Sequence, residues 1–396
     1  MQHVEAPLSI YLHIPFCSVR CGYCAFNTYT ELEQLIPAYV DALCRELEAV
    51  ADSSPHKDVQ TLYFGGGTPS LLTVKQFELL LEQLGDIFPL SDDVEISLEA
   101  NPDDLKTEYL RELRALGFNR LSIGMQSANA DILRLFDRQH DLETVCSVVE
   151  AARDAQFDNL NLDVIFGSPG ESLADWKHTV AVVLSLAPDH VSMYGLELKG
   201  GTDLRHRVDS GELPQPDDDV FADMYEYAAD VMKRHGYEQY EISNWCRTGK
   251  QCRHNLQYWR NLPYAGVGAG AHGFAGGIRY STIASPQRYI AALANGLDRP
   301  FAFPLTPAVA KHKTVTRAED LYETIMMGMR MTGEGINRSA FLGRFGEDFV
   351  SMFPEQVERL ASRELIQLSE DTVRLGDAGR LLSNGIIREF VDRING

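Results

Sequence analysis

Short apolar runs alternate with amphipathic helical patterns over the first half of the chain. Six β-rich runs cover residues 9–15, 61–64, 94–100, 120–126, 160–167 and 190–198. Helical patterns lie between them, for example at 38–50, 74–84 and 143–155. This alternation is typical of parallel strands with helices outside. We therefore predict an α/β fold in which six βα units curl into an open, partial barrel, with its chemistry at the carboxyl ends of the strands.

The pattern changes after the predicted barrel. Residues 1–200 form the barrel domain, and 201–305 are irregular and rich in Gly, Tyr and Trp, which indicates an extension of the barrel. Residues 306–396 read as three helices, a β-hairpin and a last helix, the order of an α+β, winged-helix-like domain. Winged helices often bind DNA, but this segment carries no basic stripe.

Polar residues gather at the predicted carboxyl ends of the strands. The second strand leads into GGGT at 65–68, and Glu99 and Gln126 end the third and fourth strands. Asp163 lies late in the fifth strand and Glu197 lies near the end of the sixth. A random surface would scatter these residues, so their clustering predicts a binding site at this mouth of the barrel.

A cysteine motif follows the first predicted strand. Cys17, Cys21 and Cys24 have the spacing Cys-x3-Cys-x2-Cys within a total of 7 cysteines. An odd, clustered set favours metal binding over disulfides. Three thiolates on a short loop can hold a [4Fe–4S] cluster and leave its fourth iron without a protein ligand. The amino nitrogen and carboxylate of the methionine in S-adenosylmethionine (SAM) can chelate that iron, and one electron from the reduced cluster can then cleave SAM to methionine and a 5′-deoxyadenosyl radical.

Other uses of cysteine and histidine stay open at this point. A zinc site would add His13 or a later residue to the same three thiolates. Cys44 and Cys146 lie on amphipathic helical patterns, so we expect them to pack in the core. Cys246 and Cys252 are ambiguous from the sequence alone.

The polar strand ends fit a SAM pocket beside such a cluster. Gly66, Gly67 and Thr68 would let backbone amides and carbonyls approach the methionine ammonium and carboxylate closely. Four side chains could complete a polar ring around SAM: Glu99, Gln126, Arg138 and Asp163. An arginine in this ring could pair with the methionine carboxylate through two hydrogen bonds. The alternatives are a tight turn for the glycines and salt bridges at the barrel rim for the charged residues.

Charge and hydropathy narrow the possible partners. The formal net charge is −21, so the chain repels phosphate backbones and we expect no nucleic acid partner. No apolar run approaches the ~20 residues that span a bilayer. The first residues lack the basic and apolar segments of a signal peptide. We therefore expect a cytoplasmic protein that meets membranes only through a partner.

Several motifs together resemble one known family. They are YLHIPFCSVRCGYC, YFGGGTPSLL, SLEANP, FNRLSIGMQS, DRQH and LDVIFGSPGES, in that order from Tyr11 to Ser172. They resemble the oxygen-independent coproporphyrinogen III oxidase family of radical SAM proteins, and the likeness runs from about residue 8 to the C-terminus. It implies a radical SAM barrel, and it implies SAM contacts at Tyr11, Gly66, Gly67, Thr68, Glu99, Gln126, Arg138, Asp163 and Glu197. The match at Glu197 is one of position only.

Two departures point to one branch of that family. The oxidases carry a fourth cysteine two residues after the third, where this chain has Phe26. They also carry a long N-terminal arm, whereas only ten residues precede Tyr11. Both features resemble the HemW branch, whose members are heme-binding chaperones. That branch shares the motif His-Asn-x-x-Tyr-Trp, which appears here as His254, Asn255, Tyr258 and Trp259.

The chemistry of this motif suits heme. His254 could be an axial ligand to heme iron, with Cys252 as a second possible ligand. Tyr258 and Trp259 could pack on the flat macrocycle. The alternative is that His254 is a hydrogen-bonded core histidine and that the aromatic residues are core residues.

The resemblance implies a heme chaperone that binds heme, a [4Fe–4S] cluster and SAM and passes heme to an acceptor protein. It also implies an electron donor such as a flavodoxin or a ferredoxin. Whether the chain is an enzyme stays open. The alternatives are a coproporphyrinogen III dehydrogenase, which decarboxylates its substrate oxidatively to protoporphyrinogen IX, and a radical SAM methyltransferase or heme-opening enzyme on the same scaffold.

Overall fold

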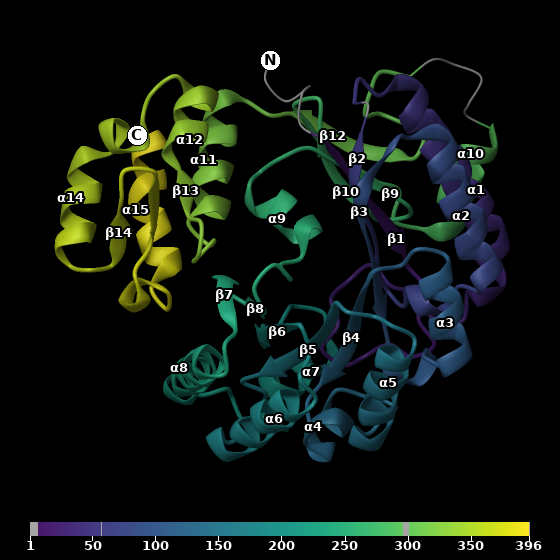
Figure 1. Cartoon of the computed structure of the whole chain (residues 1–396), viewed down its shortest axis with the longest axis horizontal. Coiled ribbons are helices and arrows are strands. Elements are labelled where there is room, and N and C mark those ends of the chain that lie inside the picture. Colours follow the sequence, from purple (N-terminus) through teal and green to yellow (C-terminus); the bar gives the residue numbers. More distant parts are fainter. Residues whose placement is uncertain (1–6, 57, 296–300, 396) are drawn as a thin grey trace.

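A curved sheet organises most of the molecule. The computed structural model describes residues 7–56, 58–295 and 301–395. Within these ranges, a 12-stranded sheet runs in the order β12-β11-β10-β9-β1-β2-β3-β4-β5-β6-β8-β7, and a 3-stranded sheet lies near the C-terminus. The large sheet forms an open arch with helices on its convex side (Figure 1). The first six residues, on which the expectation of no signal peptide partly rests, lie outside the described residues.

Six parallel strands form the centre of the large sheet. They pair in chain order, and each pairing is parallel. They are β1 Leu8–Ile14, β2 Val59–Gly66, β3 Leu90–Ala100, β4 Arg120–Gln126, β5 Leu160–Phe166 and β6 His190–Gly195. The predicted open barrel of six βα units is confirmed, and β2 and β3 extend beyond the predicted runs.

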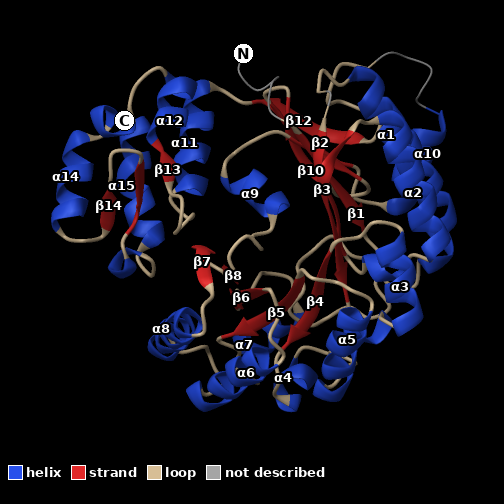
Figure 2. Ribbon diagram, viewed as in Figure 1, coloured by secondary structure: helices blue, strands red, loops and turns tan. Residues whose placement is uncertain are grey.

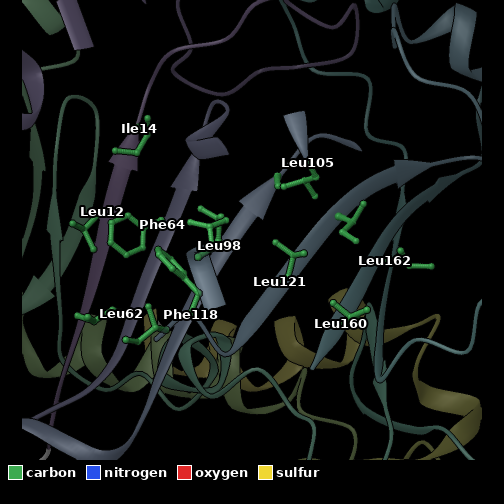
Figure 3. Close-up of a cluster of buried hydrophobic side chains, with 14 of the residues drawn as sticks. Leu12, Ile14, Leu62, Phe64, Leu98, Leu105, Phe118, Leu121, Leu160 and Leu162 are labelled. Carbon is green, nitrogen blue, oxygen red and sulfur yellow. The ribbon is translucent and has the colours of Figure 1, made fainter. Parts of the chain in front are cut away.

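The two faces of these strands differ in polarity. Leu12 pairs in register with Phe64, and Phe64 pairs with Leu98. The row continues through Leu121 and Leu160, and all five side chains are fully buried (Figure 3). They belong to one core cluster with apolar side chains of the surrounding helices. Successive side chains of a strand point to opposite faces. The residues directly before and after these five along each strand therefore line the lumen of the barrel.

Helices follow the strands and cover the outside of the arch (Figure 2). The six that connect the parallel strands are α1 Ile36–Ser53, α2 Val74–Ile87, α3 Thr107–Ala115, α4 Ala130–Leu135, α5 Leu142–Asp154 and α6 Leu173–Ser185. Capping boxes fix two of their starts, with Thr73 and Gln76 at α2 and Ser172 and Asp175 at α6. Across the described ranges, no helix is both long enough and apolar enough to cross a membrane.

The segment 201–305, which the sequence suggested to be irregular, extends both edges of the sheet. Its elements are α7 Asp203–Asp209, α8 Asp218–Arg234, β7 Glu238–Glu241, β8 Asn244–Cys246, α9 Arg253–Trp259, β9 Tyr264–Val267, β10 His272–Ala275, β11 Ile278–Thr282 and α10 Pro286–Asn295. β8 joins β6 at one edge, and β9 joins β1 at the other. These strands have three to five residues, which is too short for a clear two-residue period.

The C-terminal part has its own core. Its elements are α11 Arg317–Gly328, β13 Ile336–Asn337, α12 Arg338–Phe345, α13 Phe349–Met352, α14 Pro354–Ser362, β14 Ile366–Leu368, β15 Thr372–Leu375 and α15 Ser383–Asn395. The predicted order of three helices, a hairpin and a helix is confirmed, with β13 and α13 as additions. Its core packs Phe349 against Phe341, Phe353 and Phe390. The strand before it, β12 Val309–Thr314, pairs with β11, so the barrel sheet extends past the expected boundary at residue 306.

Candidate functional site

The cysteine loop is closed at its base. The backbone N–H of Tyr29 donates to the carbonyl of Pro15 (2.7 Å), and the N–H of Cys17 donates to the carbonyl of Tyr29 (2.9 Å). Cys17 is buried, Cys21 and Cys24 are partly exposed, and none of the three forms a disulfide. Because β1 ends at Ile14, the loop presents these thiols at the carboxyl end of the first strand.

The glycine-rich turn after β2 packs directly on this loop. A Cβ atom on Gly67 would lie 2.7 Å from the carbonyl oxygen of Phe16 and 3.0 Å from the Sγ of Cys17. The Thr68 hydroxyl donates a hydrogen bond to the same Sγ (3.4 Å). Burial is the main cause that raises the pKa of the Cys17 thiol to about 11. A bound cation such as cluster iron is therefore needed to hold the thiolate at neutral pH.

Glu99 lies beside the same turn. The Tyr63 hydroxyl donates to its Oε1 (2.8 Å), and the backbone N–H of Gly66 donates to its Oε2 (3.1 Å). Gly66 has a φ of +116°, and a Cβ atom there would lie 2.6 Å from the ring of His13, so only glycine fits. Desolvation in the lumen raises the pKa of Glu99.

Asp163 faces the lumen from β5. Its carboxylate accepts hydrogen bonds from the Ser122 hydroxyl (2.8 Å) and the Asn161 amide (2.9 Å). Asn161 also donates to the Ser122 hydroxyl oxygen (2.6 Å). This network fixes the orientation of Asp163 from two neighbouring strands.

Arg138 reaches back to the cysteine loop from beyond α4. Its Nη2 donates to the carbonyl of Gly124 (2.7 Å), and its Nη1 lies 3.5 Å from the Sγ of Cys21. Its Nε is buried without a hydrogen-bond partner among the described residues. Burial opposes its charge, but Tyr23 and Cys21 act in the other direction, and the pKa of Arg138 is raised overall. Gln126, at the end of β4, has a φ of +64°, a strained backbone often found at functional sites.

Glu197 lies apart from this group. β6 ends at Gly195, and the side chain of Glu197 is 72% exposed and forms an ion pair with Lys199. The SAM contact expected at this position therefore stays a prediction.

Tyr11 and His13 lie one above the other on β1, where alternate residues face the lumen. The Tyr11 hydroxyl lies 3.1 Å from His13 Nδ1, and His13 Nε2 lies 3.0 Å from the carbonyl oxygen of Asn27. Both ring nitrogens of His13 are thus engaged, and it offers none to a zinc ion. No set of three or more His, Cys, Asp or Glu side chains in the described part of the chain converges on a single metal ion. The thiolates of a cubane cluster bind different irons, so they need not converge on one atom.

His254 closes the opposite end of the lumen. Its Nδ1 lies 2.7 Å from the Thr61 hydroxyl, and its Nε2 lies 2.7 Å from the Tyr258 hydroxyl. It is fully buried, and burial, followed by the charge of Arg120, lowers its pKa to about 3. In this arrangement His254 has no free nitrogen for heme iron. The structure is consistent with the alternative given above, in which His254 is a hydrogen-bonded core histidine.

Cys252 is enclosed as well. It is fully buried, with its Sγ 3.6 Å from a Glu95 carboxylate oxygen, and burial is the main cause that raises its pKa to about 12. The same carboxylate accepts hydrogen bonds from the backbone N–H groups of Arg253 (2.8 Å) and His254 (3.1 Å) at the start of α9. The structure therefore uses this region to anchor α9, and it offers no heme ligand at Cys252.

The aromatic residues of α9 line two cavities. Tyr258 lines a cavity of about 580 Å³ that also adjoins the cysteine loop at Phe26. Trp259 lines a cavity of about 740 Å³ between the barrel and the C-terminal part, together with Phe274 and Phe341. The aromatic half of the motif thus reaches open space, whereas its histidine does not.

Sequence reasoning missed three residues that position the site. Tyr63, Ser122 and Asn161 hold the carboxylates of Glu99 and Asp163. A signal was available, because each lies an even number of residues from another lumen-facing position on its strand. The clearest example is Asn161, which lies two residues before Asp163 on β5.

Comparison with known proteins places this geometry in a family context. The model of the Radical SAM superfamily matches residues 11–183, and that of the HemN C-terminal domain matches residues 315–382. A Bacillus subtilis protein named "Heme chaperone HemW" is 36% identical over 387 residues, covering 98% of this chain and 100% of the relative. A Mycobacterium tuberculosis protein of the same name is 38% identical over 388 residues, covering 97% and 95%.

One solved structure is similar over nearly the whole chain. Coproporphyrinogen III oxidase (HemN) from Escherichia coli aligns with a TM-score of 0.82, covering 98% of this chain and 91% of that one. The two sequences are 24% identical, so the likeness shows a shared fold.

Proposed function

Because the chain belongs to the HemW family within the radical SAM superfamily, we propose that it is a heme chaperone, which binds heme and delivers it to an acceptor protein. The observation that carries the proposal is the match over almost the whole chain to proteins named as heme chaperones. Phe26 supports it, because this residue occupies the position of the fourth cysteine in the oxidases and is 68% exposed beside a cavity.

The residues present fit the cofactors that the superfamily implies. Cys17, Cys21 and Cys24 would each hold one iron of a [4Fe–4S] cluster. When bound, the cluster supplies the electron that cleaves SAM. The close packing of the Gly67 turn on the loop fixes the thiol of Cys17, and the Thr68 hydroxyl donates to its sulfur.

The polar lumen fits SAM next to that loop. The unpartnered Nε of Arg138 is suited to the methionine carboxylate, because buried guanidinium groups pair well with carboxylates. The backbone at Gly66 can approach the same end of SAM, and Gln126 adds an amide at the end of β4. Glu99 and Asp163 would offset the positive charges of the ammonium and the sulfonium, or accept hydrogen bonds from the ribose.

The remaining partners follow from this role. We place the protein in the cytoplasm, with a heme-accepting protein and an electron donor such as a flavodoxin or a ferredoxin as partners. A net charge of −21 disfavours nucleic acid. Contact with a membrane would come through the acceptor. The rival functions are coproporphyrinogen III dehydrogenation and radical methyl transfer or heme opening.

A paired experiment tests the proposal. The protein, reconstituted anaerobically with its cluster, is titrated with heme and, in parallel, incubated with coproporphyrinogen III, SAM and a strong reductant. We expect a saturable Soret change and no protoporphyrinogen IX. Multiple turnovers to protoporphyrinogen IX would replace the chaperone with the oxidase. If the protein neither binds heme nor turns over coproporphyrinogen III, the methyltransferase-like rival is favoured.

A further inference from the structure

A cavity of about 580 Å³ opens between the cysteine loop, α9 and strands β9 to β11. Its size falls in the range of roughly 300–1,000 Å³ that is typical of small-molecule sites. The walls combine aromatic rings with a few polar groups, and six of the lining residues are Tyr11, Phe26, Tyr258, Tyr264, His272 and Arg279. This composition suits a flat, largely apolar ligand that carries a small number of polar groups.

The aromatic rings of this cavity are held in place. Tyr258 and Tyr264 pack edge to face, with centroids 4.5 Å apart. The Tyr258 hydroxyl is fixed by His254 (2.7 Å), so the buried histidine of the HNxxYW motif sets the position of a wall residue. Phe26 of the cysteine loop contributes an exposed ring to the same cavity. A planar macrocycle can pack against rings of this kind.

His272 differs from the other histidines near the lumen. His13 and His254 have both ring nitrogens engaged by other groups of the chain. The side chain of His272 makes no hydrogen bond or ion pair to another described residue, is exposed, and lines the cavity. Histidine is a common axial ligand of heme iron, and the ring nitrogens of His272 are not engaged by other described groups.

The strand register places the cationic side chain of Lys311 on the same face of the sheet as His272. His272 on β10 pairs with Ser281 on β11, and Ser281 pairs with Lys311 on β12. Directly paired residues share one face of a sheet, so Lys311 lies on the His272 face two strands away. Lys311 is exposed, and the ion pairs among the described residues do not include it. Arg279, on the same face, is already paired with Glu323. Lys311 is therefore suited to a ligand carboxylate.

We propose that heme binds in this cavity, with His272 as an axial ligand to the iron, Tyr258 and Tyr264 against the macrocycle, and Lys311 near a propionate. This heme site rests on the proposed heme-chaperone function, because it says where such a chaperone would bind heme. It replaces His254 as ligand and gives Tyr258 of the HNxxYW motif a direct contact with heme, whereas Trp259 lines the other cavity. It also puts heme beside Phe26, two residues after the last cluster cysteine.

The test uses the full chain with its cluster reconstituted under anaerobic conditions. Ferric heme is titrated into wild type, His272→Gly and His312→Gly, and binding is followed by Soret absorbance and electron paramagnetic resonance. His312 is the matched control, because it is exposed on β12 of the same sheet and pairs with Tyr280, on the face opposite to Lys311. We expect His272→Gly to lose the histidine-ligated spectrum and to weaken heme binding roughly tenfold or more. His312→Gly should match wild type.

Rescue and a charge variant make the test specific. Added imidazole should restore the histidine-ligated spectrum of His272→Gly, which an indirect structural effect would not allow. Lys311→Glu should weaken binding while it keeps the wild-type spectrum. An unchanged spectrum and affinity in His272→Gly would place heme elsewhere and leave the chaperone function standing. Equal losses in His272→Gly and His312→Gly would also overturn the site. Absence of heme binding in wild type would overturn both the site and the function.

Discussion

The two ends of the barrel lumen contain similar residue types but differ in how those residues are satisfied. At the carboxyl ends of the strands, the Nε of Arg138 has no partner among the described residues, and the backbone is strained at Gln126. At the other end, His254 and Glu95 are fully engaged by Thr61, Tyr258 and the first backbone N–H groups of α9. A strained residue beside an unsatisfied group therefore distinguishes the end at which we propose that the cofactors bind.

The closed end also contains a buried cation. Arg120 is buried, and two of its nitrogens lack hydrogen bonds to described residues. Burial opposes its charge, but Cys252 and Glu95 act in the other direction, and its pKa is raised overall. Orphaned nitrogens alone thus do not identify a ligand site. At the cofactor end they coincide with strain and with three thiols on one loop.

The largest expected effect is loss of the cluster at the open end. Cys17→Ala, Cys21→Ala and Cys24→Ala should each abolish it, because every thiolate holds a different iron. Iron and sulfide analysis of anaerobically purified protein measures the result. Cys44→Ala is the control, since Cys44 packs against the core on α1 and should leave the iron content unchanged. A full cluster in any of the three loop variants would refute the ligand assignment.

A smaller effect tests the packing between the glycine turn and the cysteine loop. In Gly67→Ala the new Cβ would lie 2.7 Å and 2.9 Å from two backbone carbonyl oxygens, those of Phe16 and Ile14. Backbone atoms cannot rotate away, so we expect a loss of about 1–3 kcal/mol in the free energy of unfolding, and weaker SAM binding. Urea denaturation and calorimetric titration of SAM measure the two.

The matched control for this change lies on α2. Gly85 is exposed in a helix, and a Cβ atom there meets nothing within 4 Å. Gly85→Ala should therefore raise the free energy of unfolding by about 0.5–1 kcal/mol and leave SAM binding unchanged. If Gly67→Ala were as stable as Gly85→Ala and bound SAM normally, the turn would not need glycine at position 67.

The open end could be predicted from the sequence because its residues follow regular strands. Once the six βα units are recognised, the carboxyl ends of the strands must share one edge of the sheet, and Glu99, Gln126 and Asp163 follow from that rule. Glu197 lies outside β6, which ends at Gly195, and a strand end cannot be fixed to two residues from its pattern.

The closed end could not be predicted because its partners are remote in the sequence. His254 is held by Thr61, 193 residues earlier in the chain. A motif shows that a histidine is present, but it does not show which groups occupy its nitrogens. The short strands β7 to β11 were missed for a related reason, since pairing with β6 and β1 rather than local pattern makes them strands.

The smallest expected effect concerns the closed end and is a pH dependence of stability. The folded pKa of His254 is about 3, below its ordinary value of 6.5, mainly because of burial. Between these values the unfolded chain binds a proton that the folded chain does not, so stability falls as the pH falls through this window. From about pH 7.5 to about pH 5.5 the loss from this group is about 1 kcal/mol.

His254→Gln retains hydrogen-bonding capacity toward Thr61 and Tyr258 but does not titrate. Its free energy of unfolding should therefore depend less steeply on pH than that of wild type, by that amount, whereas His312→Gln at the exposed edge strand should follow wild type. Urea denaturation at the two pH values measures the slopes. Equal slopes for wild type and His254→Gln would mean that His254 is accessible to protons in the folded protein, and the distinction between an open and a closed end of the lumen would fail.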